Sequence, residues 1–245
     1  SASSELSGWQ TMFWIMALFG LVVLIGNHRY LIETLPIEKR RASTPRGLIR
    51  GYRNVLRDRI YLGLVLFSGF QISALFVYLG TVPFLYQETF GLSEGQFGLA
   101  FAMSASLSWL GVQTGSRLPK IFPAQWLLLI YAFIGVGVGI GLIITSSAGE
   151  FWSAQALFGL LLFNFGSTIT SIQTIALLNH GEQAGTAAGL LGVSNFTFTS
   201  IFSAIFGFIS TTETAQAGVA IGALYFVALL SLVFISQPQK IERFN

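Results

Sequence analysis

The sequence predicts an all-α membrane protein in which seven helices cross a lipid bilayer. Of its 245 residues, 53% are hydrophobic and only 9% are charged, whereas about a quarter of an ordinary soluble domain is charged. Seven runs come close to the roughly 20 residues that a helix needs to cross about 30 Å of hydrocarbon. These runs cover residues 9–26, 62–85, 97–114, 126–145, 152–178, 186–208 and 217–235.

No run carries Asp, Glu, Lys, Arg or His in its interior. This supports the prediction, because one charged side chain at mid-bilayer costs about 2.5–3.5 kcal/mol. The first run lacks a basic flank and a small-residue cleavage site, so we interpret it as a membrane span and not as a signal peptide. The chain begins at Ser1 without a methionine, and we expect it to be a fragment of a longer protein.

Positive charges follow alternate spans. The connections around Glu94, Glu150 and Glu213 contain no Lys or Arg. The positive-inside rule therefore places the other connections and the carboxyl terminus in the cytoplasm, and the amino end outside. The thirteen basic residues are Arg29, Lys39, Arg40, Arg41, Arg46, Arg50, Arg53, Arg57, Arg59, Arg117, Lys120, Lys240 and Arg243.

The first basic connection, residues 37–60, contains an amphipathic pattern. Apolar and basic side chains fall on opposite faces of one helix, which favours a helix lying against anionic lipid headgroups. The apolar face holds Leu48, Tyr52, Val55 and Leu56, and the basic face holds Arg50, Arg53 and Arg57.

Polar side chains are concentrated in the second, third, fifth and sixth runs, while the first, fourth and seventh have almost none. A period of three helices with a lipid-facing last member is typical of transporters built from repeats. The inward faces could line a cavity or hold helices together. We favour the cavity for the amides and contacts between helices for the hydroxyls. The candidate substrate-pathway residues are Gln71, Tyr78, Ser104, Asn164, Thr168, Asn195 and Phe198.

Glycines in the fourth run recur as Gly135, Gly137, Gly139 and Gly141. This spacing favours close approach of another helix over a phosphate-binding loop, because no strand precedes it. We expect the same of the glycines at the start of the sixth run, Gly185, Gly189 and Gly192.

The sequence lacks the residues that several other classes of protein need for their function. Zero cysteines and two histidines leave no expected metal site, and we expect no cofactor and no catalytic residue. The basic residues lie in loops between spans, so we expect no nucleic-acid partner. A retinal protein needs a lysine inside the bundle, and an intramembrane hydrolase needs a nucleophile with its base or paired acids there. Transport remains.

Three segments resemble the bicyclomycin-resistance (Bcr/CflA) type of drug–proton antiporter in the major facilitator superfamily. They are LIETLP at 31–36, PFLYQETFGLS at 83–93 followed by Phe97 and Gly98, and AGTAAGLLG at 184–192. The resemblance implies a twelve-helix fold, of which this chain is helix six plus the carboxyl-terminal six-helix half. The implied divisions are 1–36, the last helix of the amino-terminal half; 37–60, the cytoplasmic linker; and 61–245, the carboxyl-terminal half.

The resemblance also implies a function. It predicts multidrug efflux and antibiotic resistance at the bacterial inner membrane, with drug-like amphipathic molecules exchanged for protons by alternating access. The implied partners are the substrate, protons, membrane lipids and the missing amino-terminal half, which carries the family's proton-coupling acid. The family's Arg- and Gly-rich loop is reduced here around Arg117, for which gating is the implied role. Two alternatives stay open: a nutrient or metabolite transporter for sugars or amino acids, and a non-transporting membrane scaffold.

Overall fold

The computed structural model describes residues 8–31, 45–178, 184–208 and 213–236. Contacts divide the chain into two units, Ser1–Thr44 and Pro45–Asn245. The first unit contains α1 (Gly8–Tyr30). The second contains α2 (Pro45–Arg57), α3 (Arg59–Phe84), η2 (Leu85–Thr89), α4 (Glu94–Arg117), η3 (Leu118–Lys120), α5 (Ala124–Ser146), α6 (Phe151–Leu178), α7 (Ala184–Phe208), α8 (Thr214–Ser231) and η5 (Leu232–Ser236).

Each of the seven predicted spans is a helix, and the described residues contain no strand, which confirms the all-α membrane fold. Six helices are both long and apolar enough to cross a bilayer: Phe13–Tyr30, Arg59–Thr89, Trp126–Ser146, Phe151–Ala176, Ala184–Phe206 and Thr214–Ser236. The seventh, α4, has 24 residues but a more polar composition, with serines at 104, 106 and 108. That α4 crosses the membrane stays a prediction.

Local capping explains where two of the helices begin. The Asp58 side chain accepts a hydrogen bond from the Ile60 amide at 2.9 Å, which satisfies a free donor at the start of α3. Ser93 and Gln96 form a capping box at the start of α4: the Ser93 amide donates to Gln96 Oε1 at 2.9 Å, and the Gln96 amide donates to Ser93 Oγ at 3.4 Å. At the other end of α3, Pro83 cannot donate a backbone hydrogen bond, and the helix continues as the π-helical turn η2.

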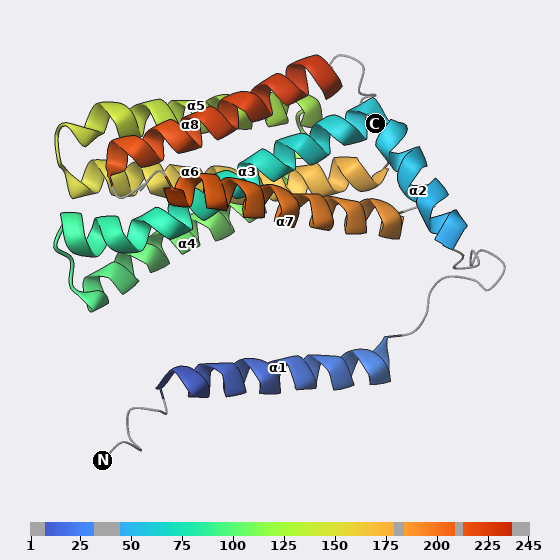
Figure 1. Cartoon of the computed structure of the whole chain (residues 1–245), viewed down its shortest axis with the longest axis horizontal. Coiled ribbons are helices and arrows are strands. Elements are labelled where there is room, and N and C mark those ends of the chain that lie inside the picture. The colour runs from blue at the N-terminus through green and yellow to red at the C-terminus, as the bar shows by residue number, and fades with distance from the viewer. Residues whose placement is uncertain (1–7, 32–44, 179–183, 209–212, 237–245) are drawn as a thin grey trace. The chain divides into compact units, whose positions relative to one another are not determined.

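In the second unit, the long helices pack side by side as one bundle (Figure 1). Helix α4 packs mainly against α6, and α5 packs mainly against α8. Helix α3 contacts α7, α8 and α6, so it lies at the centre of the packing. The short helix α2 contacts α7 and the start of α3.

Glycines allow main-chain contact between two pairs of helices. A Cβ on Gly139 of α5 would lie 2.5 Å from the Gly222 nitrogen and 2.8 Å from the Gly218 oxygen, both on α8. A Cβ on Gly111 of α4 would meet the carbonyl of Phe163 on α6. The prediction of close helix approach is therefore confirmed for Gly139 of the fourth span, and it is wrong for Gly137, whose added Cβ would meet no atom within 4 Å.

The remaining glycines of the pattern differ among themselves. Gly135 lies under the ring of Tyr225, and Gly141 lies beside Leu157, whereas Gly137 has no neighbour within 4 Å of an added Cβ. The expected close approach was wrong for Gly185, Gly189 and Gly192, which in the described residues also face open space.

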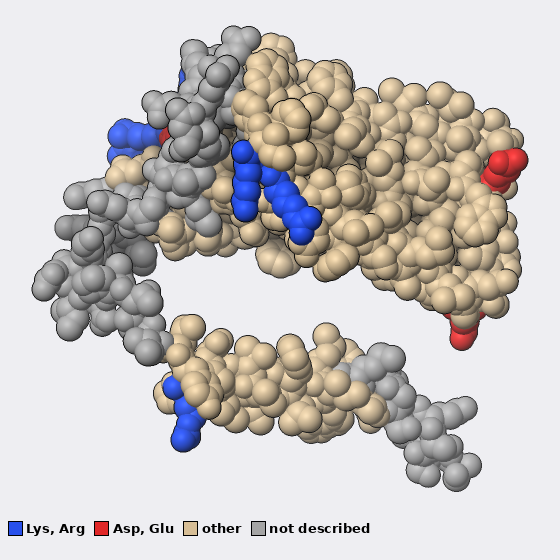
Figure 2. Space-filling model, turned by 180° about the vertical axis from the view of Figure 1, so that it is seen from behind, with Lys and Arg blue, Asp and Glu red and all other residues tan. Residues whose placement is uncertain are grey.

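Charged side chains of the second unit, as far as the structure describes it, lie mainly at its two ends (Figure 2). Asp58, which caps α3, is the acidic exception at the basic end. This distribution follows the alternation of basic and acidic connections along the chain. From the helix bounds and the course of the helices in Figure 1, the described basic residues at one end are Arg53, Arg57, Arg59, Arg117 and Lys120, and the acidic residues at the other are Glu88, Glu94, Glu150 and Glu213.

Candidate functional site

Most hydroxyls inside the bundle bond to their own helix. Thr168 donates to the Asn164 carbonyl at 2.6 Å, Ser167 to the Phe163 carbonyl at 2.9 Å, and Ser73 to the Gly69 carbonyl at 2.8 Å. Each bond satisfies the hydroxyl within one turn of the helix. These hydroxyls therefore need neither a cavity nor a neighbouring helix.

Asn164 links three helices at the centre of the bundle. Its Nδ2 donates to the Tyr131 carbonyl on α5 at 3.1 Å and to the Tyr225 hydroxyl on α8 at 3.3 Å. The Tyr225 hydroxyl also lies next to Gln71 of α3. Asn164 Oδ1 and Gln71 Nε2 are buried and have no hydrogen-bond partner in the described part of the chain. An unpaired buried polar group costs about 1–3 kcal/mol, so both atoms are places where a water or ligand group would be stabilised.

Gln155 organises a second network toward the acidic end. Its Oε1 accepts from the Tyr86 hydroxyl at 2.5 Å, and its Nε2 donates to the Ala100 carbonyl and to Ser104 Oγ, both at 3.0 Å. Tyr78 lies beside this network, with its hydroxyl next to Ser104 and its ring 5.3 Å from that of Phe158. Through Gln155 the network connects η2, which holds Tyr86, with the first half of α4 and the start of α6.

The contact between α3 and α7 is aromatic. We call it the α3–α7 seam and define it by Phe70, Asn195, Phe198, Thr199 and Phe202. The Phe70 ring lies 5.0 Å from Phe198 and 5.5 Å from Phe202. Asn195 Oδ1 and Thr199 Oγ1 are buried there without a hydrogen-bond partner among residues that the structure describes. The seam thus combines apolar ring surface with unpaired acceptors.

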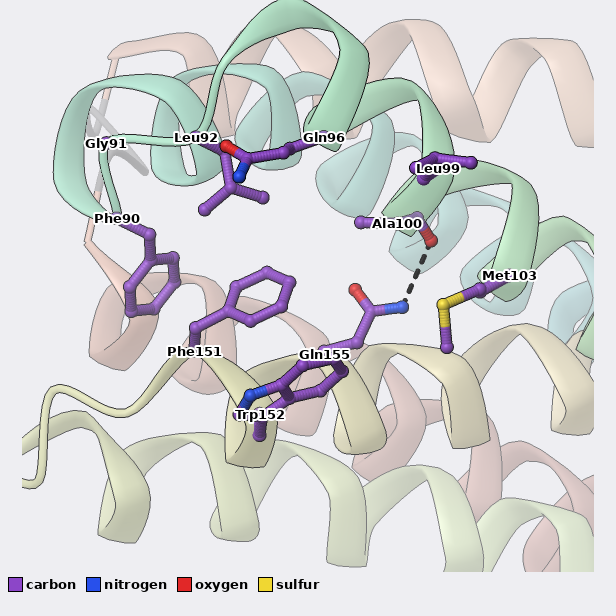
Figure 3. Close-up of a pocket in the computed structure, with 10 residues that line it drawn as sticks. All are labelled: Phe90, Gly91, Leu92, Gln96, Leu99, Ala100, Met103, Phe151, Trp152 and Gln155. Carbon is purple, nitrogen blue, oxygen red and sulfur yellow. Dashed lines mark hydrogen bonds between the residues drawn. The ribbon is translucent and has the colours of Figure 1, made fainter.

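A pocket of about 520 Å³ lies at the acidic end, between α4 and α6 (Figure 3). Figure 3 shows side chains of both helices and of the preceding loop converging on it, with the Gln155 amide bonded to the Ala100 carbonyl. We call it the α4–α6 pocket. It is lined by Phe90, Gly91, Leu92, Gln96, Leu99, Ala100, Met103, Phe151, Trp152 and Gln155.

The candidate residues suggested by the sequence lie in three different parts of the structure: the bundle interior, the α3–α7 seam and the basic end. None of them lines the α4–α6 pocket. Five are buried in the bundle: Gln71, Asn164 and Thr168 near its centre, and Tyr78 with Ser104 next to Gln155. Asn195 and Phe198 are half-buried in the α3–α7 seam, and Arg117 is exposed in the last turn of α4, at the basic end.

Sequence reasoning missed Gln155 and its partner Tyr86. Gln155 lies close to the start of its span, and Tyr86 directly follows the end of the second predicted span. A signal was present, because an amide in an apolar run requires hydrogen-bond partners. In the described ranges, no three His, Asp or Glu side chains come together in a way that could hold a metal ion.

The fold and these sites define a polytopic helical membrane protein whose buried polar side chains, among the residues that the structure describes, are amides and hydroxyls without a formal charge. The chain belongs to the major facilitator superfamily, whose sequence profile matches residues 2–204. Its relatives are transporters and not enzymes.

Curated relatives are similar at low identity. An uncharacterized MFS-type transporter of Bacillus subtilis (strain 168), YdgK, is 28% identical over 235 residues, covering 95% of this chain and 57% of the relative. The multidrug resistance protein MdtL of Escherichia fergusonii is 27% identical over 198 residues, covering 79% and 48%. MdtL of Escherichia coli O139:H28 is 26% identical over the same length. The chain spans about half the length of the curated relatives it matches.

Proposed function

We propose that a transporter containing this chain exports drug-like amphipathic molecules in exchange for protons by alternating access, and that it is of the bicyclomycin-resistance type. The observation that carries the proposal is the α3–α7 seam, in a chain whose relatives include multidrug resistance proteins. The edge-to-face and tilted phenylalanine rings of the seam offer apolar surface for varied substrates, and its unpaired acceptors orient a polar group. A sugar site would require more amides and fewer rings, so the seam disfavours the nutrient alternative.

In this proposal, residues 61–245 form the carboxyl-terminal half of the translocation pathway and residues 1–36 the helix before it. The basic end faces the cytoplasm of a bacterial inner membrane, as the positive-inside rule requires. Asn195 and Phe198, which are half-buried, are the first of the candidate residues that a substrate contacts. Gln71, Tyr78, Ser104, Asn164 and Thr168 reach substrate only when the helices separate during the cycle. Arg117 lies at the cytoplasmic opening, where it serves gating.

Residues 37–60 link the halves in this proposal, and α2 lies on the cytoplasmic membrane surface. Val55 is buried against the bundle, while Tyr52 and Leu56 are exposed, as are the basic Arg53 and Arg57. Exposed apolar and cationic side chains on one short helix suit the boundary between acyl chains and anionic headgroups. A spin label at Tyr52 should be accessible to lipid-soluble relaxation agents, and access only to water-soluble agents would contradict this placement.

Transport by the full-length protein in liposomes tests the proposal. Efflux of a fluorescent dye or an antibiotic should require a pH gradient and should stop when a protonophore collapses it. No gradient-dependent movement of any dye or antibiotic would refute antiport. Saturable competition by a single sugar or amino acid would instead support a nutrient transporter, and a folded protein that moves no solute would support a scaffold.

Substitutions on α7 test the seam itself. Phe198→Ala should change the order of preference among drugs, because it removes ring surface that substrates contact. Phe196→Ala is the matched control, since Phe196 is on the same helix, two residues away, and 72% exposed. Combined alanines at Gln71, Tyr78, Asn164 and Asn195 provide a second test: in a variant that folds, an unchanged drug profile would assign all four to packing alone.

A further inference from the structure

The α4–α6 pocket is separate from the α3–α7 seam and shares no residue with it. Its volume of about 520 Å³ falls within the roughly 300–1,000 Å³ typical of small-molecule sites. Three aromatic side chains, Phe90, Phe151 and Trp152, approach it from the loop and from α6 (Figure 3). Phe90 and Phe151 hold each other in an edge-to-face arrangement, with ring centres 5.7 Å apart.

The Gln155 amide and the Gln96 side-chain oxygen in the pocket wall already have partners within the protein. Gln155 uses both amide atoms, bonding to Tyr86, Ala100 and Ser104. Gln96 Oε1 accepts from the Ser93 amide in the capping box. A ligand therefore meets mainly ring faces and aliphatic side chains, which favour a large apolar molecule over a sugar or a peptide.

Charge further selects the ligand. Glu94 is in the first turn of α4, Glu150 directly precedes Phe151, and the described Lys and Arg residues of the second unit lie at its opposite end (Figure 2). The amino termini of α4 and α6 each contribute about half a positive charge. Two full carboxylate charges outweigh them. The field at the pocket mouth is negative, and aromatic faces attract cations as well.

We propose that the α4–α6 pocket binds lipophilic organic cations that carry aromatic or other bulky apolar groups. A neutral acyl chain would fill the same apolar walls but would gain nothing from the carboxylates. A lipophilic anion would be repelled by them. Binding here is a property of the resting protein and requires neither a gradient nor the α3–α7 seam.

Protection of an introduced cysteine tests this site directly in the full-length protein, in which any cysteine outside this chain is first replaced by serine; the chain has none of its own. Leu99 lines the pocket near the start of α4, and its side chain is 70% exposed on the protein surface, so labelling of Leu99→Cys by a membrane-permeant maleimide reports on the pocket. Tetraphenylphosphonium at saturating concentration should slow that reaction about tenfold. Ile144→Cys is the control, because Ile144 is 67% exposed near the end of α5 and lies outside the pocket. Met103→Cys provides a second reporter in the same wall.

Two comparisons separate charge from shape. Tetraphenylborate has the shape of tetraphenylphosphonium and the opposite charge, so it should protect Leu99→Cys at least tenfold less well. Glu150→Gln should raise the half-protecting phosphonium concentration about threefold, as expected for the loss of one screened charge beside the pocket residue Phe151. Glu213→Gln, at the start of α8, should leave it unchanged.

The proposal is overturned if phosphonium protects neither cysteine reporter, or if borate protects equally well. It is also overturned if Glu150→Gln has no more effect than Glu213→Gln. Because labelling is measured without a pH gradient, its outcome is independent of whether the transporter proves to be a proton antiporter. A protein that binds phosphonium at Leu99→Cys and moves no drug would refute the proposed function alone.

Discussion

Gly139 and Gly137 face different surroundings on one helix, so replacing each with alanine tests the packing of α5. In Gly139→Ala the new Cβ would lie 2.5 Å from the Gly222 nitrogen and 2.8 Å from the Gly218 oxygen. Main-chain atoms have no rotamer to change, so α5 and α8 must separate by about 1 Å to restore ordinary contact. Overpacking of this kind costs about 1–3 kcal/mol.

In Gly137→Ala the new Cβ meets no atom within 4 Å, and replacing glycine in a helix stabilises it by up to about 1 kcal/mol. Gly139→Ala gains the same helix propensity, so the two variants should differ in unfolding free energy by the overpacking cost alone, about 1–3 kcal/mol. Reversible unfolding in mixed detergent micelles, followed by helical circular dichroism, measures this difference. Equal stabilities, or a more stable Gly139→Ala, would refute the backbone contact between α5 and α8.

Three further predictions follow from the polar network, the charge separation and the loop before α4. Gln155→Leu should lower the free energy of unfolding by about 1–3 kcal/mol, because it leaves the Tyr86 hydroxyl buried without its acceptor. Adding Tyr86→Phe should recover part of this loss. A membrane-impermeant maleimide applied to intact cells should label a cysteine at position Glu150 but not one at position Arg53, and the reverse pattern would invert the proposed orientation. Gly91 has φ +67°, so Gly91→Ala should cost about 1–2 kcal/mol of unfolding free energy, and no measurable loss would contradict that backbone conformation.

The helices could be predicted because the bilayer sets their length and the cost of charge in hydrocarbon sets their composition. Helix α4 shows the limit of that argument. Its serines and glycines lower its apolar character, yet Gly111 and Gly115 of α4 approach the α6 main chain directly. Close packing against another helix, which composition does not describe, accounts for these residues.

The candidate site was harder to predict, because each amide depends on partners far away in sequence. Asn164 faces Tyr131 and Tyr225 only because α5 and α8 present particular faces to α6. Glycine spacing has the same limit. Gly135 and Gly139 contact α8, whereas Gly185 and Gly189, with equal spacing, contact no neighbour in the described residues.

The glycine contacts also determine which parts of the bundle can slide. Helices that contact each other through side chains can accommodate small shifts, because the side chains can change rotamer. The α4–α6 and α5–α8 pairs touch through carbonyls and α-carbons instead, and these atoms have no such freedom. We therefore expect rearrangements of the bundle to occur more readily where α3 and α7 contact these pairs than at the glycine contacts themselves.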